Sequence, residues 1–385
     1  MRRLIRAFAM TEGGAAIGRD PSRAALSPAR RALLRFRGDR LAVIGTATLL
    51  VIAVVCVVGP VLSPHRYDQV YRDYVKVAPS LNAHPTSAES ARILQRIAAG
   101  MGARLIESSM AGGLMRATLE AEAPIDPDFV GDFSRSGAFA DPRVVASEDG
   151  GRRLTVEAKP RRLYFPLGAD SNGRDLLTRL FVGGQVSLLV GSLASAVALV
   201  IGLAYGAIAG YFGGRVDLVM MRVVDILYAL PFIFFVILLI VVFGRHFVLV
   251  FVAIGAVEWL DMARIVRGQA LSLKRQDYVT AAEALGVSPF GVLTRHIAPN
   301  LLGPVIAYLT LVAAKVILLE SFLSFLGLGV QEPMTSLGAL IADGARNIED
   351  APGMLLFPAG LLAALLLALT LIGEGLSDAL SPRER

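Results

Sequence analysis

Charged residues interrupt the longest apolar stretches of the sequence. Lys315 and Glu320 lie in one such stretch, and Asp225 lies in another. A charge in the middle of a membrane costs on the order of a few kcal/mol, so it normally faces a cavity or a partner. Lys315 and Glu320 stand about 140° apart around a helix, so we do not expect them to pair with each other. They could line a polar path or bind across an interface with another subunit, and we favour the interface. Asp225 could be interfacial too.

A different kind of pattern occupies residues 278–300, which read YVTAAEALGVSPFGVLTRHIAPN. A first short helix is predicted, with Asp277 placed to cap it and Gly286 placed to end it in a left-handed conformation. The residues spaced for one face of this helix are largely apolar: Tyr278, Ala282 and Leu285.

A second short helix is predicted to begin with Ser288 as its N-cap and Pro289 as its first residue, and to be closed by Pro299. Its apolar face consists of Phe290, Leu293 and Ile297. Two short helices at a fixed angle would form a rigid, partly apolar knob that can dock into a groove on a partner. The same pattern fits an amphipathic helix lying on the membrane surface, and the spacing alone favours neither reading.

The sequence lacks the residue patterns of catalysis. No phosphate loop surrounds any of its lysines, which are Lys76, Lys159, Lys274 and Lys315. There is no G-x-S-x-G or H-E-x-x-H pattern, and the single cysteine, Cys56, lies in an apolar run. We therefore expect no enzyme activity, no cofactor and no metal, and a nucleotide-driven motor would have to be a separate subunit.

The composition indicates a membrane protein. Of the 385 residues, 55% are hydrophobic and 18% are charged, whereas a soluble protein usually carries about a quarter charged residues. The net charge of +6 comes from basic residues in the N-terminal tail and in loops beside apolar stretches, as the positive-inside rule expects. Because no basic face with interleaved aromatic residues occurs, the sequence does not favour nucleic-acid binding.

Six membrane spans are predicted, because a span needs about 20 apolar residues. They lie at about 41–63, 180–214, 217–244, from 247 onward, 301–329 and 354–376. The second span carries a ridge of small residues suited to close helix packing, formed by Gly202, Gly206 and Gly210. Pro231 is expected to kink the third span. The fourth meets three charged residues after about three turns, and we expect a local charge network of Glu258, Asp261 and Arg264.

Lysines and arginines in the short loops predict the orientation. The Arg-rich tail at 1–40 is expected to be cytoplasmic and disordered, and the C-terminal SPRER is expected on the same side. The segment at 64–179 then lies outside, because one span precedes it.

This outer segment has signals of both helix and strand. A capping box from Thr86 to Glu89 opens a helix that runs to about Ala99. The segments at 114–122 and 152–160 alternate as exposed strands do. We predict a small α+β domain, and a disordered insertion is the alternative.

The sequence TAAEALG at 280–286, followed by Ala298-Pro299, resembles the EAA loop of ABC importer permeases. The pattern matches at Ala281, Ala282, Gly286 and Pro299, whereas Thr280 stands where the name-giving Glu would be. The resemblance implies a cytoplasmic coupling loop at 265–300 that contacts ATPase subunits. Its contact residues would be Thr280, Ala281, Ala282, Glu283, Gly286 and Pro299.

Other stretches are similar to the oligopeptide/dipeptide importer group: LGADSNGRDLLTRL (167–180), GYFGGRVDLVMMRVVDILYALP (210–231), FLSFLGLGVQEPMTSLGALIADG (322–344), RFRGDRLAVIG and GLSDALSPR. The resemblance covers residues 30–66 and 165–385. It implies an all-α polytopic membrane protein with the six-helix type I ABC importer permease fold and a C-type subunit role. Transmembrane helix 1 would be 41–63, a periplasmic insert 64–179 and the permease core 180–385. The long insert at 67–162 departs from many relatives and could be an added contact for a binding protein.

The resemblance also implies the function and the partners. The function would be ATP-driven import of oligopeptides or dipeptides across a bacterial inner membrane, with both termini cytoplasmic. The partners would be a B-type permease, two cytoplasmic ABC ATPases, a periplasmic peptide-binding protein, the peptide and the lipid membrane. Alternatives with the same fold carry a nickel complex, glutathione or a peptide antibiotic. Alternatives from other classes are an ATP-independent channel or secondary transporter, and a non-transporting membrane scaffold.

Overall fold

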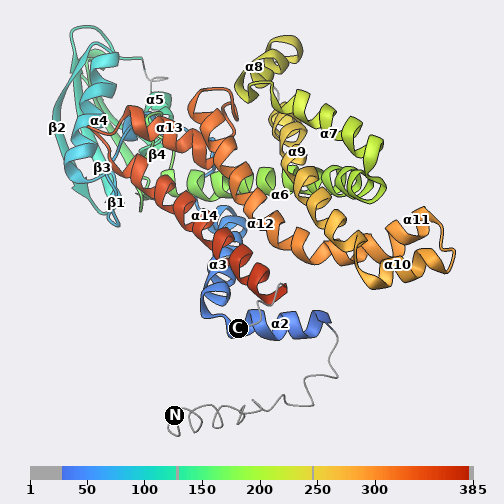
Figure 1. Ribbon diagram of the computed structural model, residues 1–385. Helices are drawn as coiled ribbons and strands as arrows, with labels where there is room; N and C mark the ends of the chain where they lie inside the picture. Colours follow the sequence, from blue (N-terminus) through green and yellow to red (C-terminus); the bar gives the residue numbers. More distant parts are fainter. Residues whose placement is uncertain (1–27, 127–129, 245–246, 381–385) are drawn as a thin grey trace, which may run out of the picture.

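The computed structural model describes residues 28–126, 130–244 and 247–380. Long helices form most of the described chain, and a small mixed α+β unit stands at one end of them (Figure 1). Within the described residues, four helices are long and apolar enough to cross a membrane, or five if one bent pair counts as a single span. The four are Arg40–Leu62, Leu176–Phe212, Pro289–Phe325 and Gly353–Leu380. The predicted number of six is therefore not reached by length and composition alone.

The first of these helices, α3 (Arg40–Leu62), forms where the sequence predicts a span at 41–63. Asp39 is its N-cap, and its carboxylate accepts a hydrogen bond from the Leu41 amide at 2.9 Å. The preceding helix, α2 (Pro28–Gly38), corrects part of the prediction of a disordered tail. Residues 1–27 and the C-terminal SPRER lie outside the described residues.

Helix α6 (Leu176–Phe212) has 37 residues and runs about 55 Å. It begins four residues before the predicted start at 180, because Asp175 caps it and accepts a hydrogen bond from the Thr178 amide at 2.7 Å. The predicted ridge of small residues is confirmed, since it packs directly on α9 (Phe247–Lys274). A Cβ at Gly202 would lie 2.6 Å from the Met262 Cβ, which is too close for any side chain.

The predicted third span is broken rather than kinked. Helices α7 (Gly214–Tyr228) and α8 (Phe232–Phe243) meet at an angle of 76°. Pro231 is the N-cap of α8, where its missing N–H and its ring prevent α7 from continuing. The bend is sharper than the prediction because the helix stops at Tyr228, before the proline.

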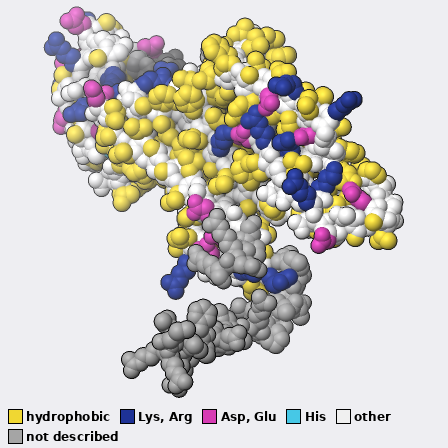
Figure 2. Space-filling model, viewed as in Figure 1, with side chains coloured by type: hydrophobic (Ala, Val, Ile, Leu, Met, Phe, Trp, Pro, Cys, Tyr) yellow, Lys and Arg dark blue, Asp and Glu magenta, His cyan; other side chains and the backbone are white. Residues whose placement is uncertain are grey.

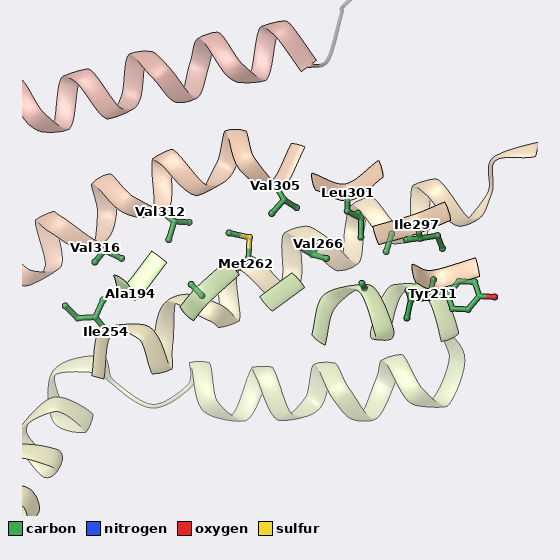
Figure 3. Packing of buried hydrophobic residues seen from close by; sticks show 14 of the residues in the cluster. Ala194, Tyr211, Ile254, Met262, Val266, Ile297, Leu301, Val305, Val312 and Val316 are labelled. Carbon is green, nitrogen blue, oxygen red and sulfur yellow. The ribbon is translucent and has the colours of Figure 1, made fainter. Parts of the chain in front are cut away.

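The fourth predicted span corresponds to α9, which continues well past its charged residues as one helix of 28 residues. The last two spans are α12 (Ala298–Phe325) and α14 (Gly353–Leu380), joined by a short helix, α13 (Leu337–Arg346). Valines of α12 pack against α6 and α9 in the largest core, where Val312 lies near Met262 and Val316 lies near Ala194 and Ile254 (Figure 3).

The α+β unit contains, among the described residues, an antiparallel sheet in the order β2-β3-β5-β4. Its strands are β2 (Ala103–Ala111), β3 (Leu114–Ala121), β4 (Phe139–Glu148) and β5 (Arg153–Pro160). Helices α4 (Ser87–Gly100) and α5 (Val130–Arg135) complete the unit. A short antiparallel strand pair, β1 (Ala83–His84) with β6 (Leu163–Tyr164), lies where the chain enters and leaves it. The predicted capping box is confirmed, because Thr86 and Glu89 make both of its hydrogen bonds. The unit has a core of its own, where Leu94 packs near Leu119 and Val156.

Candidate functional site

The segment at 276–297, which we call the knob, projects from the opposite end of the helical body to the sheet (Figure 1). It consists of α10 (Asp277–Ala284), α11 (Pro289–Val292) and a π-helical turn (Leu293–Ile297). Gly286 has φ +80° and ends α10. Its amide donates to the Glu283 carbonyl at 3.0 Å, and the Val287 amide donates to the Ala282 carbonyl at 3.1 Å. This left-handed helix end confirms the predicted role of Gly286.

The other details of α10 differ from the prediction. Gln276 is the N-cap, so Asp277 is the first residue of the helix rather than its cap. Val279 and Ala282 are buried, whereas Leu285 is 85% exposed. The predicted apolar face is therefore wrong at Tyr278 and Leu285, which are exposed, because packing of α10 against the rest of the core buries the face that carries Val279.

The predictions for the second half of the knob are partly confirmed. The Ser288 hydroxyl accepts a hydrogen bond from the Gly291 amide at 3.2 Å, which confirms the predicted N-cap. Leu293 and Ile297 are buried as predicted, but Phe290 is 72% exposed.

Pro299 does not close the second helix. It lies in the first turn of α12, and Pro289–Phe325 is continuous. Proline lacks an N–H and excludes the carbonyl four residues before it, so an ordinary helical turn would be strained there. The π-helical turn just before it, in which the Ala298 amide donates to the Leu293 carbonyl, provides the wider geometry.

Few polar contacts tie the knob to the helical body. The Tyr211 hydroxyl, at the end of α6, donates to Glu283 Oε1 at 3.1 Å. Next to this contact and outside the knob, Lys274 Nζ donates to the Tyr211 carbonyl at 2.7 Å and so ties α9 to the end of α6. Of the other residues that the resemblance selects, Thr280 and Ala281 are exposed and Ala282 is buried. The knob is thus anchored along one side and presents apolar side chains at its tip.

The charged residues of α7, α9 and α12 lie in pairs that the sequence did not indicate. Lys315 Nζ lies 2.7 Å from Asp261 Oδ2 and 3.1 Å from Glu258 Oε1. Arg264 Nη2 lies 2.9 Å from Asp225 Oδ1. The expected local network within α9 is therefore corrected: its charged residues pair across to α7 and α12, because residues three apart on α9 face those helices.

Glu320 has a different environment from Lys315. It is fully buried inside the chain, where it accepts hydrogen bonds from Ser324 at 2.7 Å and from Ser187 of α6 at 3.1 Å. Lys315 and Glu320 are not paired with each other, as expected. Buried in this way, Glu320 reaches neither an interface nor an open path in this structure.

A second cluster, which sequence reasoning missed, lies where the α+β unit meets the helices. We call it the outer junction; it consists of residues 168–179 with the groups they contact. Asp170 is 1% exposed and forms ion pairs with Arg174 at 2.7 Å and Arg179 at 3.1 Å. These residues belong to the quoted LGADSNGRDLLTRL stretch, whose spacing of i, i+4 and i+9 was the available signal.

The outer junction also contacts α13 and the connection that precedes it. Arg174 Nη2 donates to Glu332 Oε1 at 2.7 Å, and Ser171 donates to Asp343 of α13 at 2.8 Å. The hydrogen bond from Arg174 lowers the pKa of the Glu332 carboxyl. At Gly173, a Cβ would collide with the Tyr71 carbonyl, so the chain that enters the α+β unit passes directly against this loop.

The helical body matches known protein families at its N-terminal and its C-terminal part. Residues 202–385 match the family described as "Binding-protein-dependent transport system inner membrane component", and residues 27–85 match "N-terminal TM domain of oligopeptide transport permease C". The chain is 57% identical to the oligopeptide transport system permease protein OppC of Escherichia coli over 222 residues, 58% of this chain and 73% of that protein. It is 52% identical to OppC of Haemophilus influenzae over 238 residues, 62% of this chain and 76% of the relative. The dipeptide transport system permease protein DppC of Bacillus subtilis is 40% identical over 250 residues, 65% of this chain and 77% of the relative.

Proposed function

The chain belongs to the family of binding-protein-dependent transport system inner membrane components, and from this membership we propose that it is the C-type permease subunit of an ATP-driven importer of oligopeptides or dipeptides. It is a multi-pass membrane permease component and not an enzyme. The proposed partners are a B-type permease, two cytoplasmic ABC ATPases and a periplasmic peptide-binding protein.

Six spans of a type I permease follow if the α7–α8 pair and α9 both cross the membrane. The length of α9, about 42 Å, is sufficient. Its charged residues pair with α7 and α12, which offsets part of their desolvation. In this arrangement both termini and the knob lie in the cytoplasm of a bacterial cell, and the α+β unit is periplasmic. The basic residues Arg215, Arg275 and Arg295 then lie on the inner side, in agreement with the positive-inside rule.

The knob is the proposed contact with an ATPase subunit. Leu285 and Phe290 would enter an apolar groove of that subunit, as short amphipathic helices commonly do. Thr280, Ala281 and Glu283 would flank this contact, while Ala282 and Gly286 fix its shape. Pro299 would act within α12 rather than in the contact itself.

The continuity of the second half of the knob with α12 supports a role in coupling. Because Pro289–Phe325 is unbroken, displacement of Phe290 would move the whole length of α12. ATP binding would close the two ATPases, shift the knobs and switch the spans from inward-open to outward-open. The peptide would then pass from its binding protein into the path between the permeases. Lys315 and Asp225 would face that path or the second permease.

One observation carries this proposal: the tip of the knob is apolar and exposed. Gly286 ends the first helix of the knob, and the second half of the knob is continuous with α12. An ATP-independent channel would not need such a surface. The test is reconstitution of the chain with its proposed partners in vesicles, followed by uptake of a labelled tripeptide with and without ATP. We expect uptake that requires both ATP and the binding protein. Uptake without the ATPases would support a channel, and ATP-driven uptake of a nickel complex or glutathione in place of the peptide would support the alternative cargo.

A further inference from the structure

A strongly basic segment, residues 30–40, forms α2 and the start of α3. It carries five arginines: Arg30, Arg31, Arg35, Arg37 and Arg40. Its one acid, Asp39, is the N-cap of α3 and accepts a hydrogen bond from the Leu41 amide at 2.9 Å. Figure 2 shows basic side chains at the lower end of the molecule, where Figure 1 places α2. We call residues 30–40 the basic segment.

Packing fixes the basic segment across the end of two helices. The Phe36 ring of α2 lies 3.4 Å from the place of a Cβ at Gly375 of α14, and the same Cβ would collide with Ala42 of α3. The small residue thus lets both helices lie against α14. Only Asp39 separates α2 from α3, which is long and apolar enough to cross a membrane. The basic segment therefore lies at the surface of the membrane that α3 enters.

The chain does not neutralise these arginines. Four of them, Arg31, Arg35, Arg37 and Arg40, are exposed and form no ion pair within the part of the chain that the structure describes. Two exposed acids of α14 belong to the same end of the molecule, Glu374 and Asp378, and neither is paired with them. By contrast, the arginines of α9 each meet a carboxylate of α7. The basic segment is therefore a cationic surface that an external anion can approach.

Apolar side chains in the same segment favour a lipid over a dissolved anion. Leu33 is 55% exposed and Leu34 is 49% exposed, although both stand among arginines. The exposed apolar surface continues on α3 with Leu41 and Ile44. A helix that presents both leucines and arginines is suited to the boundary between headgroups and acyl chains. There the leucines reach apolar material while the arginine stems lie along it and the guanidinium groups reach phosphate.

We propose that the basic segment is a binding surface for the headgroups of anionic phospholipids. Arg31 and Arg35 stand one helical turn apart on one flank of α2, so they can hold phosphates of neighbouring lipids, and Arg37 stands on the other flank. Guanidinium groups bind phosphate through two parallel hydrogen bonds, which suits this contact. The lipids supply the negative charge that the chain lacks here, and they hold α2 against α14. This inference goes beyond the proposed transport function and does not depend on the cargo.

The experiment measures which lipid lies next to α2. A fluorophore is attached to the full-length chain at Gly38→Cys, where a side chain would meet open space. Cys56 is 1% exposed, and the parent chain treated in the same way provides the blank. The protein is placed in vesicles of phosphatidylcholine with a minor share of phosphatidylglycerol. A quencher is carried by one lipid or, at the same mole fraction, by the other. The readout is the ratio of quenching by phosphatidylglycerol to quenching by phosphatidylcholine.

We expect a ratio of about three in the wild type, because several arginines attract the anionic lipid together. The ratio should approach one at about 1 M salt, where charges are screened within about 3 Å. The variant Arg31→Gln with Arg35→Gln and Arg37→Gln should also approach one, whereas lysine at the same three positions should keep most of the preference. The matched control replaces three exposed arginines of the α+β unit and should keep the wild-type ratio: Arg92→Gln, Arg104→Gln and Arg162→Gln.

Equal quenching by the two lipids in the wild type would overturn the proposal, as would a preference that the glutamine variant retains. Weak quenching by both lipids would place α2 away from the bilayer, as contact with an acidic protein surface would, and would overturn it too. The salt dependence of the wild type and the lysine variant test the proposal even if the glutamine variant does not insert. None of these outcomes bears on ATP-driven peptide uptake, which is tested separately.

Discussion

At the start of α6 the charged groups are buried and paired, whereas at its end the apolar groups are exposed. Asp170 and Arg174 of the outer junction are 1% and 4% exposed and are bonded to each other. About 55 Å away, the knob is attached through Tyr211 and Glu283 and presents Leu285 and Phe290 to the outside. Helix α6 therefore connects a buried, ion-paired contact at its start to an exposed apolar surface at its end.

The difference indicates what each end does. Buried charges that are paired with each other have few favourable geometries, so the outer junction fixes the α+β unit and Glu332 relative to α6. Exposed apolar side chains gain free energy only when something covers them, so the knob is suited to a contact with another subunit. Substitutions at the outer junction should therefore reduce stability, and substitutions at the knob should reduce coupling.

The largest effect is expected for Arg174→Ala. It removes one of the two cations paired with buried Asp170 and leaves Glu332 with only the longer hydrogen bond from the Asn172 amide. Loss of one partner of a buried pair costs about 3–5 kcal/mol, so the thermal unfolding midpoint of the purified protein should drop clearly. Arg66→Ala, which removes an exposed guanidinium paired with Asp68, is the control and should leave the midpoint unchanged. Equal midpoints for both variants would contradict the role of the outer junction.

A smaller effect on stability, but a clear effect on transport, is expected for Gly286→Leu. The φ of +80° costs a residue with a side chain about 1–2 kcal/mol, so the angle between α10 and α11 should change. ATP-dependent uptake should fall about tenfold, the factor that corresponds to about 1.4 kcal/mol, while the unfolding midpoint changes little. Gly360→Leu is the matched control, because its Cβ would meet open space in a helix of ordinary φ. Intact uptake in Gly286→Leu would show that the knob geometry is not needed.

The smallest effect is a pH dependence at the outer junction. The hydrogen bond from Arg174 lowers the pKa of Glu332, so this contact contributes stability above the unfolded value of about 4.3 and loses it as the pH falls through the lowered pKa. Glu332 is 65% exposed, so the contribution should be below about 1 kcal/mol.

The unfolding midpoint should accordingly differ between wild type and Glu332→Gln from pH 7 to pH 5, and the difference should shrink below about pH 4. Glu349→Gln controls for loss of an acid. A difference that persists unchanged at low pH would mean that the ionised carboxylate does not hold Arg174.

The sequence predicted the features that are set by neighbouring residues. The left-handed end at Gly286, the Ser288 cap and the Thr86–Glu89 capping box each depend on chemistry within a few residues. Most helices of the body were also predicted, because an apolar stretch about 20 residues long has few other stable states.

What the sequence did not predict depends on distant residues. Lys315 meets Asp261 across 54 positions, and Arg174 meets Glu332 across 158. No local pattern encodes such pairs. The same reason explains the buried face of α10, where packing against the core selected Val279. Pro299 was misjudged because the π-helical turn that accommodates it has no sequence signature.

The central claim is that the knob transmits work from the ATPases to the membrane helices. Its most direct test is the number of peptides taken up per ATP hydrolysed by the reconstituted complex. The variant combines Leu285→Asp and Phe290→Asp. Both residues are exposed, so the variant should fold like the wild type. We predict that this ratio falls at least about tenfold because the ATPases no longer move α12. An unchanged ratio, in a complex that still contains all subunits, would contradict transmission of work through the knob.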